Sequence, residues 1–212
     1  MRKEKNFPHL YGPVPSRRLG YSLGVDLLPF KTCSLSCIYC QLGRSQKKTI
    51  RRINPYSEKK ILDEIKEFLK TGARVDFITF SGSGEPTLNK SIGWLIREIK
   101  KITKIPVAVL TNSTLLSRAE VRKELAAAEV VVPSLDAATQ PVFEKINRPH
   151  PSLKIEKIID GLAKFRKEFK GQIWLEIMLV KGVNDSPAHL KKLKEAVDRI
   201  NPDKIHLNTV VR

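Results

Sequence analysis

The stretch from residue 22 to residue 40 reads Ser22-Leu-Gly-Val-Asp-Leu-Leu28-Pro-Phe-Lys-Thr-Cys33-Ser-Leu-Ser-Cys37-Ile-Tyr-Cys40. Its first part, Ser22 to Leu28, predicts a strand, and its second part holds all three cysteines of the chain. Three thiolates this close together can bind three irons of an iron–sulfur cluster and leave the fourth iron without a protein ligand. That open iron is a place where chemistry can occur.

Two other roles for the cysteines stay open on this pattern alone. Free cysteines are often small buried hydrophobes, although finding all three so close together is unusual for that role. A closed zinc site needs a fourth Cys or His ligand. The histidines show no ligand spacing near the cysteines; they are His9, His150, His189 and His206. An iron–sulfur cluster is therefore the favoured interpretation.

Short apolar runs alternate with segments of helical period along the rest of the chain. Besides Ser22 to Leu28, strands are predicted at Val75 to Ser81, Pro106 to Thr111, Glu129 to Leu135, Gln172 to Val180 and Lys204 to Val210. The runs are nearly continuously apolar, as strands buried on both faces are. The order predicts an α/β fold with a parallel sheet, either open and doubly wound or curled into a barrel. Six strands would make a partial (β/α)6 TIM-like barrel, with its functional side chains at the carboxyl ends of the strands.

Signals for helix ends support this alternation. Ser57 is a predicted N-cap and Gly72 a predicted stop for the first helix. Ser117 with Glu120 three residues later predicts a capping box. Ser186 followed by Pro187 predicts a cap with proline at the first helical position.

Length and composition limit the number of domains and the compartment that the sequence allows. The 212 residues suit one domain, with residues 1–21 as an N-terminal extension. The sequence ends at Arg212 directly after the sixth predicted strand, so we expect it to be incomplete at the C-terminus. No apolar run approaches a membrane span, and the N-terminus lacks the apolar core of a secretory signal. We therefore expect a cytoplasmic protein, in a compartment where thiols stay reduced.

The net charge of +17 favours a polyanionic partner such as RNA, although a solvated basic surface would give the same count. Six basic side chains are candidate phosphate contacts: Arg17, Arg18, Lys47, Lys48, Arg51 and Arg52.

The spacing Cys33-x3-Cys37-x2-Cys40 on a loop after the first strand resembles the signature of the radical S-adenosylmethionine superfamily. The resemblance implies a 4Fe–4S cluster on these cysteines, whose open iron binds the amino and carboxylate groups of S-adenosylmethionine. Reductive cleavage of that cofactor then gives a 5'-deoxyadenosyl radical. Tyr39 matches the aromatic residue that precedes the last cysteine and packs beside the adenine. A reduced ferredoxin or flavodoxin is the expected electron donor.

A second segment supports the resemblance. The sequence Ser81-Gly82-Ser83-Gly84-Glu85-Pro86-Thr87 is similar to the family's Gly-Gly-Glu-Pro element, with Ser83 in place of the first glycine. The resemblance implies that the loop Gly82 to Pro86 contacts the methionine ammonium, and only the local contact at Ser83 departs from the pattern. Glycine lets a backbone approach a ligand closely.

Further polar residues follow the later strands. Asn112 resembles part of the Thr-Asn-Gly element of some relatives, and relatives place polar groups on the ribose or methionine carboxylate where Ser134 and Asp136 stand. Asn and Asp at strand ends are also common turn formers. Arg148 is a candidate contact for a carboxylate or phosphate, against the default of a surface arginine.

Glu176 interrupts an apolar strand, and a buried carboxylate is costly unless it is paired or lines a polar cavity. By the alternation of a strand, Trp174, Glu176 and Met178 share one face. If that face points into the barrel, Glu176 is a candidate catalytic residue, and Asn208 invites the same reasoning. The alternative is an ion pair between Glu176 and a lysine of a nearby helix.

The segments Tyr11 to Gly20, Gly24 to Thr32 and Gln41 to Arg44 resemble an incompletely characterised group of iron–sulfur oxidoreductases near the wyosine-forming tRNA-modifying enzymes. Those enzymes bind a second cluster through additional cysteines, and none remain here. The leading hypothesis is thus an enzyme that abstracts hydrogen from an unknown substrate, with RNA as a candidate. The alternative is an RNA-binding protein with a structural or redox-sensing cluster.

Overall fold

The computed structural model describes residues 7–45 and 48–210, in which seven strands form one sheet in the order of the sequence. The strands are β1 (Leu10–Ser16), β2 (Gly20–Val25), β3 (Phe77–Phe80), β4 (Val107–Thr111), β5 (Val130–Pro133), β6 (Gln172–Leu179) and β7 (Lys204–Thr209). The helices are α1 (Glu58–Leu69), the short 3-10 helix η1 (Pro86–Leu88), α2 (Ile92–Ile102), α3 (Ala119–Leu125), α4 (Gln140–Asn147), α5 (Ile155–Glu168) and α6 (Pro187–Ile200).

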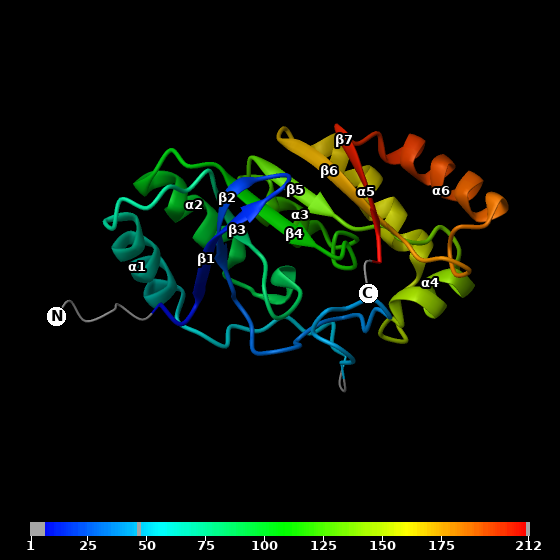
Figure 1. The fold of residues 1–212 in the computed structure, drawn as a ribbon, viewed down its shortest axis with the longest axis horizontal. Coiled ribbons are helices and arrows are strands. Elements are labelled where there is room, and N and C mark those ends of the chain that lie inside the picture. The colour runs from blue at the N-terminus through cyan, green and yellow to red at the C-terminus, as the bar shows by residue number, and fades with distance from the viewer. Residues whose placement is uncertain (1–6, 46–47, 211–212) are drawn as a thin grey trace.

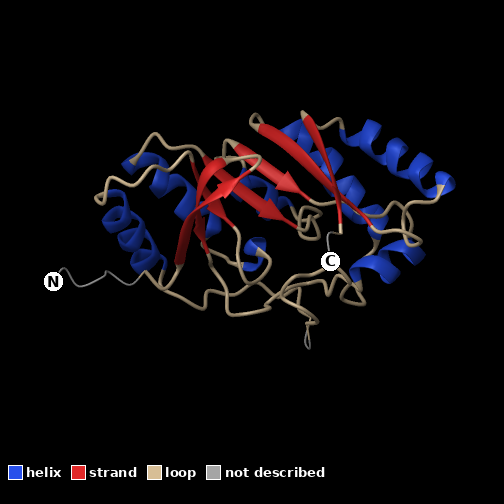
Figure 2. Ribbon diagram, viewed as in Figure 1, coloured by secondary structure: helices blue, strands red, loops and turns tan. Residues whose placement is uncertain are grey.

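The six strands β2 to β7 are parallel, as the alternating pattern predicts. The sheet curls, and the helices cover its outer face (Figure 1; Figure 2). The fold is therefore an α/β partial barrel, which confirms the predicted class. None of the helices among the described residues combines the length and the apolar character needed to cross a bilayer.

An additional strand, β1, pairs antiparallel with β2 and was not predicted. Its sequence contains Gly12, Pro13 and Pro15, which argue against regular structure. The pairing shifts register between Tyr11 and Val14, where Gly12 and Pro13 stand. β1 is an edge strand, and proline is tolerated there because only one side of the strand needs to be hydrogen-bonded.

The turn between β1 and β2 inserts Leu19 into the inside of the barrel. Leu19 is 3% exposed. It belongs to a small apolar cluster, separate from the main core, with Ala108, Val130, Val132 and Trp174. Phe77 and Leu110 pack against this cluster. Leu19 thus anchors the hairpin within the curled sheet.

The predicted helix ends are confirmed in part. Ser57 Oγ accepts from Lys60 N at 3.5 Å, and Ser186 Oγ accepts from His189 N at 3.3 Å. The capping box at Ser117 is wrong: the N-cap of α3 is Arg118, with no capping side chain. Ser117 Oγ instead donates to the Thr114 carbonyl at 3.4 Å, within the turn before the helix.

Candidate cluster and cofactor site

The cysteine-bearing segment runs from β2 along the carboxyl edge of the sheet to the end of α4 (Figure 1). Its backbone is tied to that helix, because Ser36 N donates to the Asn147 carbonyl and Ile38 N to the Ile146 carbonyl, both at 2.9 Å. Thr49 N donates to the Cys33 carbonyl at 2.9 Å, so the segment that follows the cysteines packs back against the start of their loop. The predicted position of the cysteines, at the carboxyl ends of the strands, is what the structure has.

Side-chain amides from distant parts of the chain contact two of the three thiols. Asn112, directly after β4, donates its Nδ2 to Cys33 Sγ at 3.4 Å. Asn147, at the end of α4, donates its Nδ2 to Cys37 Sγ at 3.3 Å. Burial raises the pKa of Cys33 to about 11 and that of Cys37 to about 12. These thiols therefore need a bound cation before they become thiolates at neutral pH.

The donor set fits an iron–sulfur cluster better than a single metal ion. No group of three or more His, Cys, Asp and Glu side chains within the described ranges is arranged to hold one ion. In a cluster, the three cysteines bind three different irons, so they can stand farther apart. Amide donors beside cysteine sulfurs are groups that tune a cluster. Cys33, Cys37 and Cys40 are the residues that would hold it.

Tyr39 and Asp136, both predicted cofactor contacts, lie together under the cysteine loop. The Tyr39 hydroxyl donates to Asp136 Oδ2, which also accepts from Asn147 Nδ2 at 2.7 Å. Asp136 Oδ1 accepts from the backbone N of Met178 at 2.9 Å. Burial raises the pKa of Asp136, and these donors oppose that effect. The network fixes the Tyr39 ring relative to the ends of β5 and β6.

The predicted loop Gly82 to Pro86 is tied to both neighbouring strand ends. Ser83 N donates to Asp26 Oδ2 at 2.9 Å, and the Ser83 carbonyl accepts from Lys31 N at 2.7 Å. Gly82 has φ of 136°, and a Cβ there would overlap Asp26. A Cβ on Gly84 would overlap the Thr32 carbonyl. The glycines therefore let this loop pack against the segment that leads to the cysteines.

Glu85 is 2% exposed, and its carboxylate is hydrogen-bonded within the protein. It accepts from Thr87 Oγ1 and Thr111 Oγ1, both at 2.6 Å, and from Asn112 N at 2.7 Å. The structure thus places Glu85 where it holds the backbone of Asn112, whose side chain contacts Cys33. Pro86 begins η1 directly beyond it.

Two other predicted cofactor contacts differ in position. Ser134 lies at the end of β5 and lines a small hollow of about 40 Å³ together with Tyr39, Asn112 and Asp136. Arg148 is exposed and caps the end of α4 with a left-handed φ of 44°. Its side chain has no polar partner among residues 7–45 and 48–210, although it directly follows Asn147, which contacts Cys37 and Asp136.

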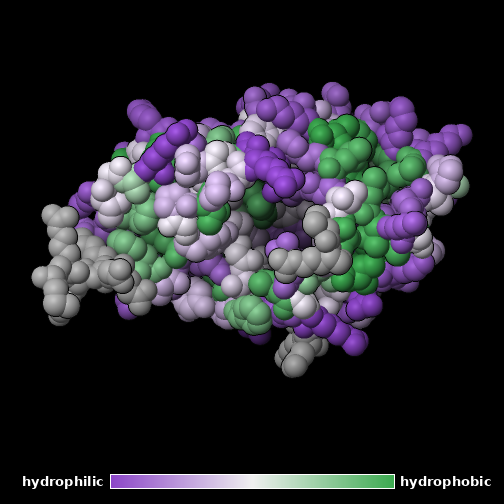
Figure 3. Space-filling model, in the orientation of Figure 1, coloured by the Kyte–Doolittle hydropathy of each residue, from purple (hydrophilic) through white to green (hydrophobic). Residues whose placement is uncertain are grey.

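Glu176 and Asn208 line a cavity of about 920 Å³ between the N-terminal hairpin, the ends of β3 and β4, and β6 and β7. The surface is visibly hollowed there (Figure 3). Asn208 Nδ2 donates to Glu176 Oε1 at 2.8 Å. Glu176 also forms an ion pair with Arg18, which lies in the hairpin turn. The face of β6 that carries Glu176 therefore points into the barrel, and its partner is not the helix lysine of the alternative interpretation.

Tyr11 and Asn147 are the site residues that sequence reasoning missed. Tyr11 lies opposite Gly24 in the β1–β2 register, and a Cβ on Gly24 would overlap the Tyr11 ring. The ring therefore lies against β2, and its hydroxyl hydrogen-bonds to Ser81 Oγ, just before the glycine loop. Burial raises the pKa of Tyr11. A glycine within an apolar strand was the available signal for this close approach.

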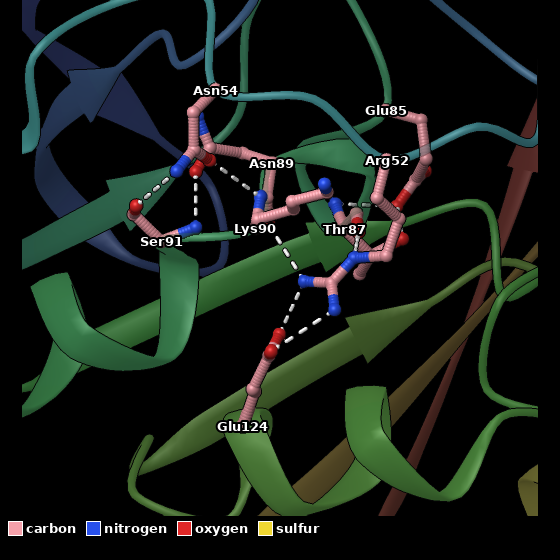
Figure 4. Close-up of polar contacts among 8 residues, drawn as sticks. All are labelled: Arg52, Asn54, Glu85, Thr87, Asn89, Lys90, Ser91 and Glu124. Carbon is pink, nitrogen blue, oxygen red and sulfur yellow. Dashed lines mark hydrogen bonds and ion pairs between the residues drawn. The ribbon is translucent and has the colours of Figure 1, made fainter.

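Two of the six candidate phosphate contacts form ion pairs inside the protein, Arg18 with Glu176 and Arg52 with Glu124. Arg52 donates from Nε to the Thr87 carbonyl at 2.9 Å and from Nη2 to the Asn89 carbonyl at 2.7 Å, and it pairs with Glu124 (Figure 4). Its side chain is 9% exposed, so it is not available to a phosphate, contrary to the prediction. Lys47 lies outside the described residues.

Comparisons with known proteins identify the family. The model of the radical SAM superfamily matches residues 27–193. A protein of Brachyspira hyodysenteriae named GTPase Obg is 46% identical over 203 residues, which are 96% of this chain and 30% of that protein. A UPF0026 protein of Methanocaldococcus jannaschii is 36% identical over 95% of this chain and 63% of its own length. A UPF0026 protein of Synechocystis is 38% identical over 97% of this chain and 77% of its own. The chain thus spans less than two thirds of the first two relatives.

Solved structures share the fold. A radical SAM methyltransferase from Sphaerobacter thermophilus superposes with a TM-score of 0.64 at 17% identity, over 89% of this chain and 55% of the other. The structure of anSMEcpe with bound AdoMet gives a TM-score of 0.64 at 18% identity, over 90% and 51%. A family of this kind implies a 4Fe–4S cluster and S-adenosylmethionine, and the three cysteines it requires are present. With its partial barrel and its matched sequence, the chain belongs to the radical SAM superfamily and groups there with the UPF0026 proteins.

Proposed function

We propose that this chain is an enzyme that holds one 4Fe–4S cluster on Cys33, Cys37 and Cys40 and cleaves S-adenosylmethionine reductively. The bound cluster and cofactor would supply a 5'-deoxyadenosyl radical for hydrogen abstraction from a substrate. The observation that carries this proposal is the pair of amide donors on Cys33 and Cys37. They come from the ends of β4 and α4, so the cysteine loop is built onto the carboxyl edge of the barrel.

The surrounding residues would act by positioning the cofactor. Asp136 holds the Tyr39 hydroxyl, which keeps the ring that would flank the adenine in one orientation. Asp26 and Lys31 hold the glycine loop close to the cysteines, so that its backbone would face the methionine ammonium. The cavity of about 920 Å³ beside these groups would take the substrate, within reach of Glu176 and Asn208.

The proposals for the substrate and the electron donor rest on sequence resemblance and on charge. The likeness to oxidoreductases near the wyosine-forming enzymes and the charge of +17 make RNA a candidate substrate. A reduced ferredoxin or flavodoxin would deliver the electron. The same charge supports the second candidate function, an RNA-binding protein whose cluster is structural or senses redox state.

The test is anaerobic reconstitution followed by reduction with dithionite in the presence of S-adenosylmethionine. We expect iron and sulfide contents that correspond to one cluster per chain, and 5'-deoxyadenosine as a product. Cys40→Ala should abolish the product. Ile38→Ala, an exposed apolar change in the same loop, should retain it.

Equilibrium dialysis separates the two candidates, because only the enzyme requires S-adenosylmethionine to bind. Absence of both binding and product in a fully reconstituted sample would rule out the leading proposal. RNA binding by that sample would then support the second one.

A further inference from the structure

We propose that the cavity inside the barrel binds a small anionic substrate, a carboxylate or a phosphate monoester, through Arg18. The binding surface consists of Arg17, Arg18, Glu176 and Asn208 and is called here the anion floor. The proposal rests on the proposed function and adds the substrate class to it.

The fold presents Arg18 to the cavity. Leu19, the next residue, is anchored in the apolar cluster inside the barrel. This anchor fixes the turn between β1 and β2, and the Arg18 side chain extends from it to Glu176 on β6. Asn208 on β7 donates to Glu176 Oε1 at 2.8 Å and so fixes the carboxylate that orients the guanidinium. The β1–β2 turn, β6 and β7 thus together place one arginine on the wall of the cavity.

The Arg18 guanidinium has hydrogen-bond donors that Glu176 does not use. A guanidinium carries five N–H donors in a planar fork, and one carboxylate accepts at most two of them along one edge. Glu176 is the only polar partner of the Arg18 side chain within the described ranges. The Arg18 side chain is 26% exposed, so its remaining donors are only partly hydrated. A ligand with anionic oxygens would satisfy them.

The charges that line the cavity also favour an anion. Arg17 and Arg18 are the cationic groups, and Glu176 is the carboxylate among the described lining residues. The Arg17 side chain has no polar partner in the part of the chain that the structure describes. Because Glu176 neutralises one arginine, a net positive charge remains beside a partly enclosed space, where electrostatic attraction is stronger than in open water.

The size of the cavity favours a small molecule over a polymer. A volume of about 920 Å³ lies in the upper part of the range for small-molecule sites. Ser81 and Gln41 line the same cavity toward the glycine loop and the cysteines, so the cofactor and a substrate could share it. The anion floor comes from other elements, with Arg17 and Arg18 in the turn that Leu19 anchors and Glu176 and Asn208 on β6 and β7.

The test is isothermal titration calorimetry on the reconstituted protein at low ionic strength, saturated with S-adenosylmethionine so that the cofactor's own carboxylate is already bound. Malonate and inorganic phosphate are the probes, and they distinguish a carboxylate from a phosphate ligand. We expect one of them to bind, and Arg18→Gln to weaken that binding about tenfold or more, as expected for the loss of a charge-assisted pair. Glu176→Gln should strengthen it, because the competing carboxylate is removed.

Arg97→Gln is the matched control, since Arg97 is exposed on α2 and does not line the cavity; it should leave the affinity unchanged. Arg18→Lys, which keeps the charge without the planar fork, should give an intermediate affinity and guards against misfolding of the glutamine variant. Absence of binding for both probes, or equal binding by Arg18→Gln, would overturn the proposal. So would a loss of S-adenosylmethionine affinity in Arg18→Gln, or Arg18-dependent binding of transfer RNA without binding of either small anion.

The formation of 5'-deoxyadenosine is measured in the same samples. A sample that makes 5'-deoxyadenosine but binds neither anion contradicts only the anion floor. A sample that makes none contradicts the proposed function instead.

Discussion

Asn112 donates its side-chain amide to the Sγ of Cys33 at 3.4 Å, while its own backbone N is held by the buried carboxylate of Glu85 at 2.7 Å. The side-chain oxygen of Asn112 accepts from Thr114 Oγ1 at 2.8 Å. The donor on this sulfur is therefore fixed from both sides. A fixed donor stabilises the more negative, reduced state of an iron–sulfur cluster more than the oxidised state.

Asn112→Ala should therefore lower the reduction potential of the reconstituted cluster by on the order of tens of mV, since a hydrogen bond of about 1 kcal/mol is lost. A redox titration followed by electron paramagnetic resonance measures this shift. Ser134→Ala is the control, because Ser134 ends the neighbouring strand and does not contact a cysteine. An unchanged potential in a variant with full iron content would show that the contact does not tune the cluster.

The parallel sheet and the position of the cysteine loop could be predicted because each is indicated by residues that are close together in the sequence. The runs that form β4, β5 and β6 are apolar over several consecutive residues, which is enough to mark a buried strand, whereas β7 alternates polar and apolar residues and is mostly exposed. The contact of Asn147 with Cys37 joins residues 110 positions apart. No local pattern carries such a contact, because it arises only when α4 returns to the cysteine loop.

Local signals also gave two wrong expectations. Ser117 and Glu120 have the spacing of a capping box, yet Arg122 donates to the Leu116 carbonyl at 3.0 Å and to the Ser117 carbonyl at 3.2 Å. A side chain of α3 itself, reaching back five and six residues, thus organises the chain before the helix in place of a capping side chain. Arg52 had the charge of a phosphate contact, but the polar groups that surround it come from two separate segments, residues 87–89 and helix α3.

Gly24 and Tyr11 offer a test of how the N-terminal hairpin is held. Gly24→Ala should lower the free energy of unfolding by about 1–3 kcal/mol, because the new methyl group would overlap the Tyr11 ring. In a Tyr11→Ala background the same change should cost less, since the ring is absent. Chemical denaturation of the four proteins in this cycle gives the coupling energy. An equal loss of free energy of unfolding in the two backgrounds would mean that the Tyr11 ring is not packed against Gly24.

The ion pair between Arg122 and Glu168 should make stability depend on pH. The hydrogen bond from Arg122 lowers the pKa of Glu168 below its usual 4.5. A carboxyl with a lowered folded-state pKa stabilises the fold above its unfolded-state pKa, and this contribution is lost as the pH falls through the folded-state value. The Glu168 side chain is 47% exposed, so solvent screening limits the effect to about 0.5 kcal/mol.

Glu168→Gln should therefore be less stable than the wild type at pH 6, and the difference should shrink as the pH falls below about 4.5. Urea denaturation across this range measures the difference. Glu195→Gln, at an exposed position on α6, should show no such trend. A difference that grew on acidification would contradict the assigned direction of the pKa shift.

Arg52 should be needed both for stability and for cofactor binding. Arg52→Ala should lower the free energy of unfolding by about 2–3 kcal/mol, because it leaves Glu124 and two carbonyls without their donor (Figure 4). The carbonyl of Thr87 lies two residues from Glu85, so the loosened segment should also weaken S-adenosylmethionine binding in equilibrium dialysis. Arg52→Lys should recover only part of both losses, since an ammonium cannot reproduce the planar fork.

Arg51→Ala is the matched control for this prediction, because Arg51 is exposed and its side chain has no polar partner in the described part of the chain. Its free energy of unfolding should stay within about 0.5 kcal/mol of the wild type. If the two alanine variants were equally stable, the buried position of Arg52 would not contribute to the fold. If Arg52→Ala lost stability but kept full cofactor affinity, the contacts of Arg52 would stabilise the fold without holding the loop Gly82 to Pro86 in the conformation that binds the cofactor.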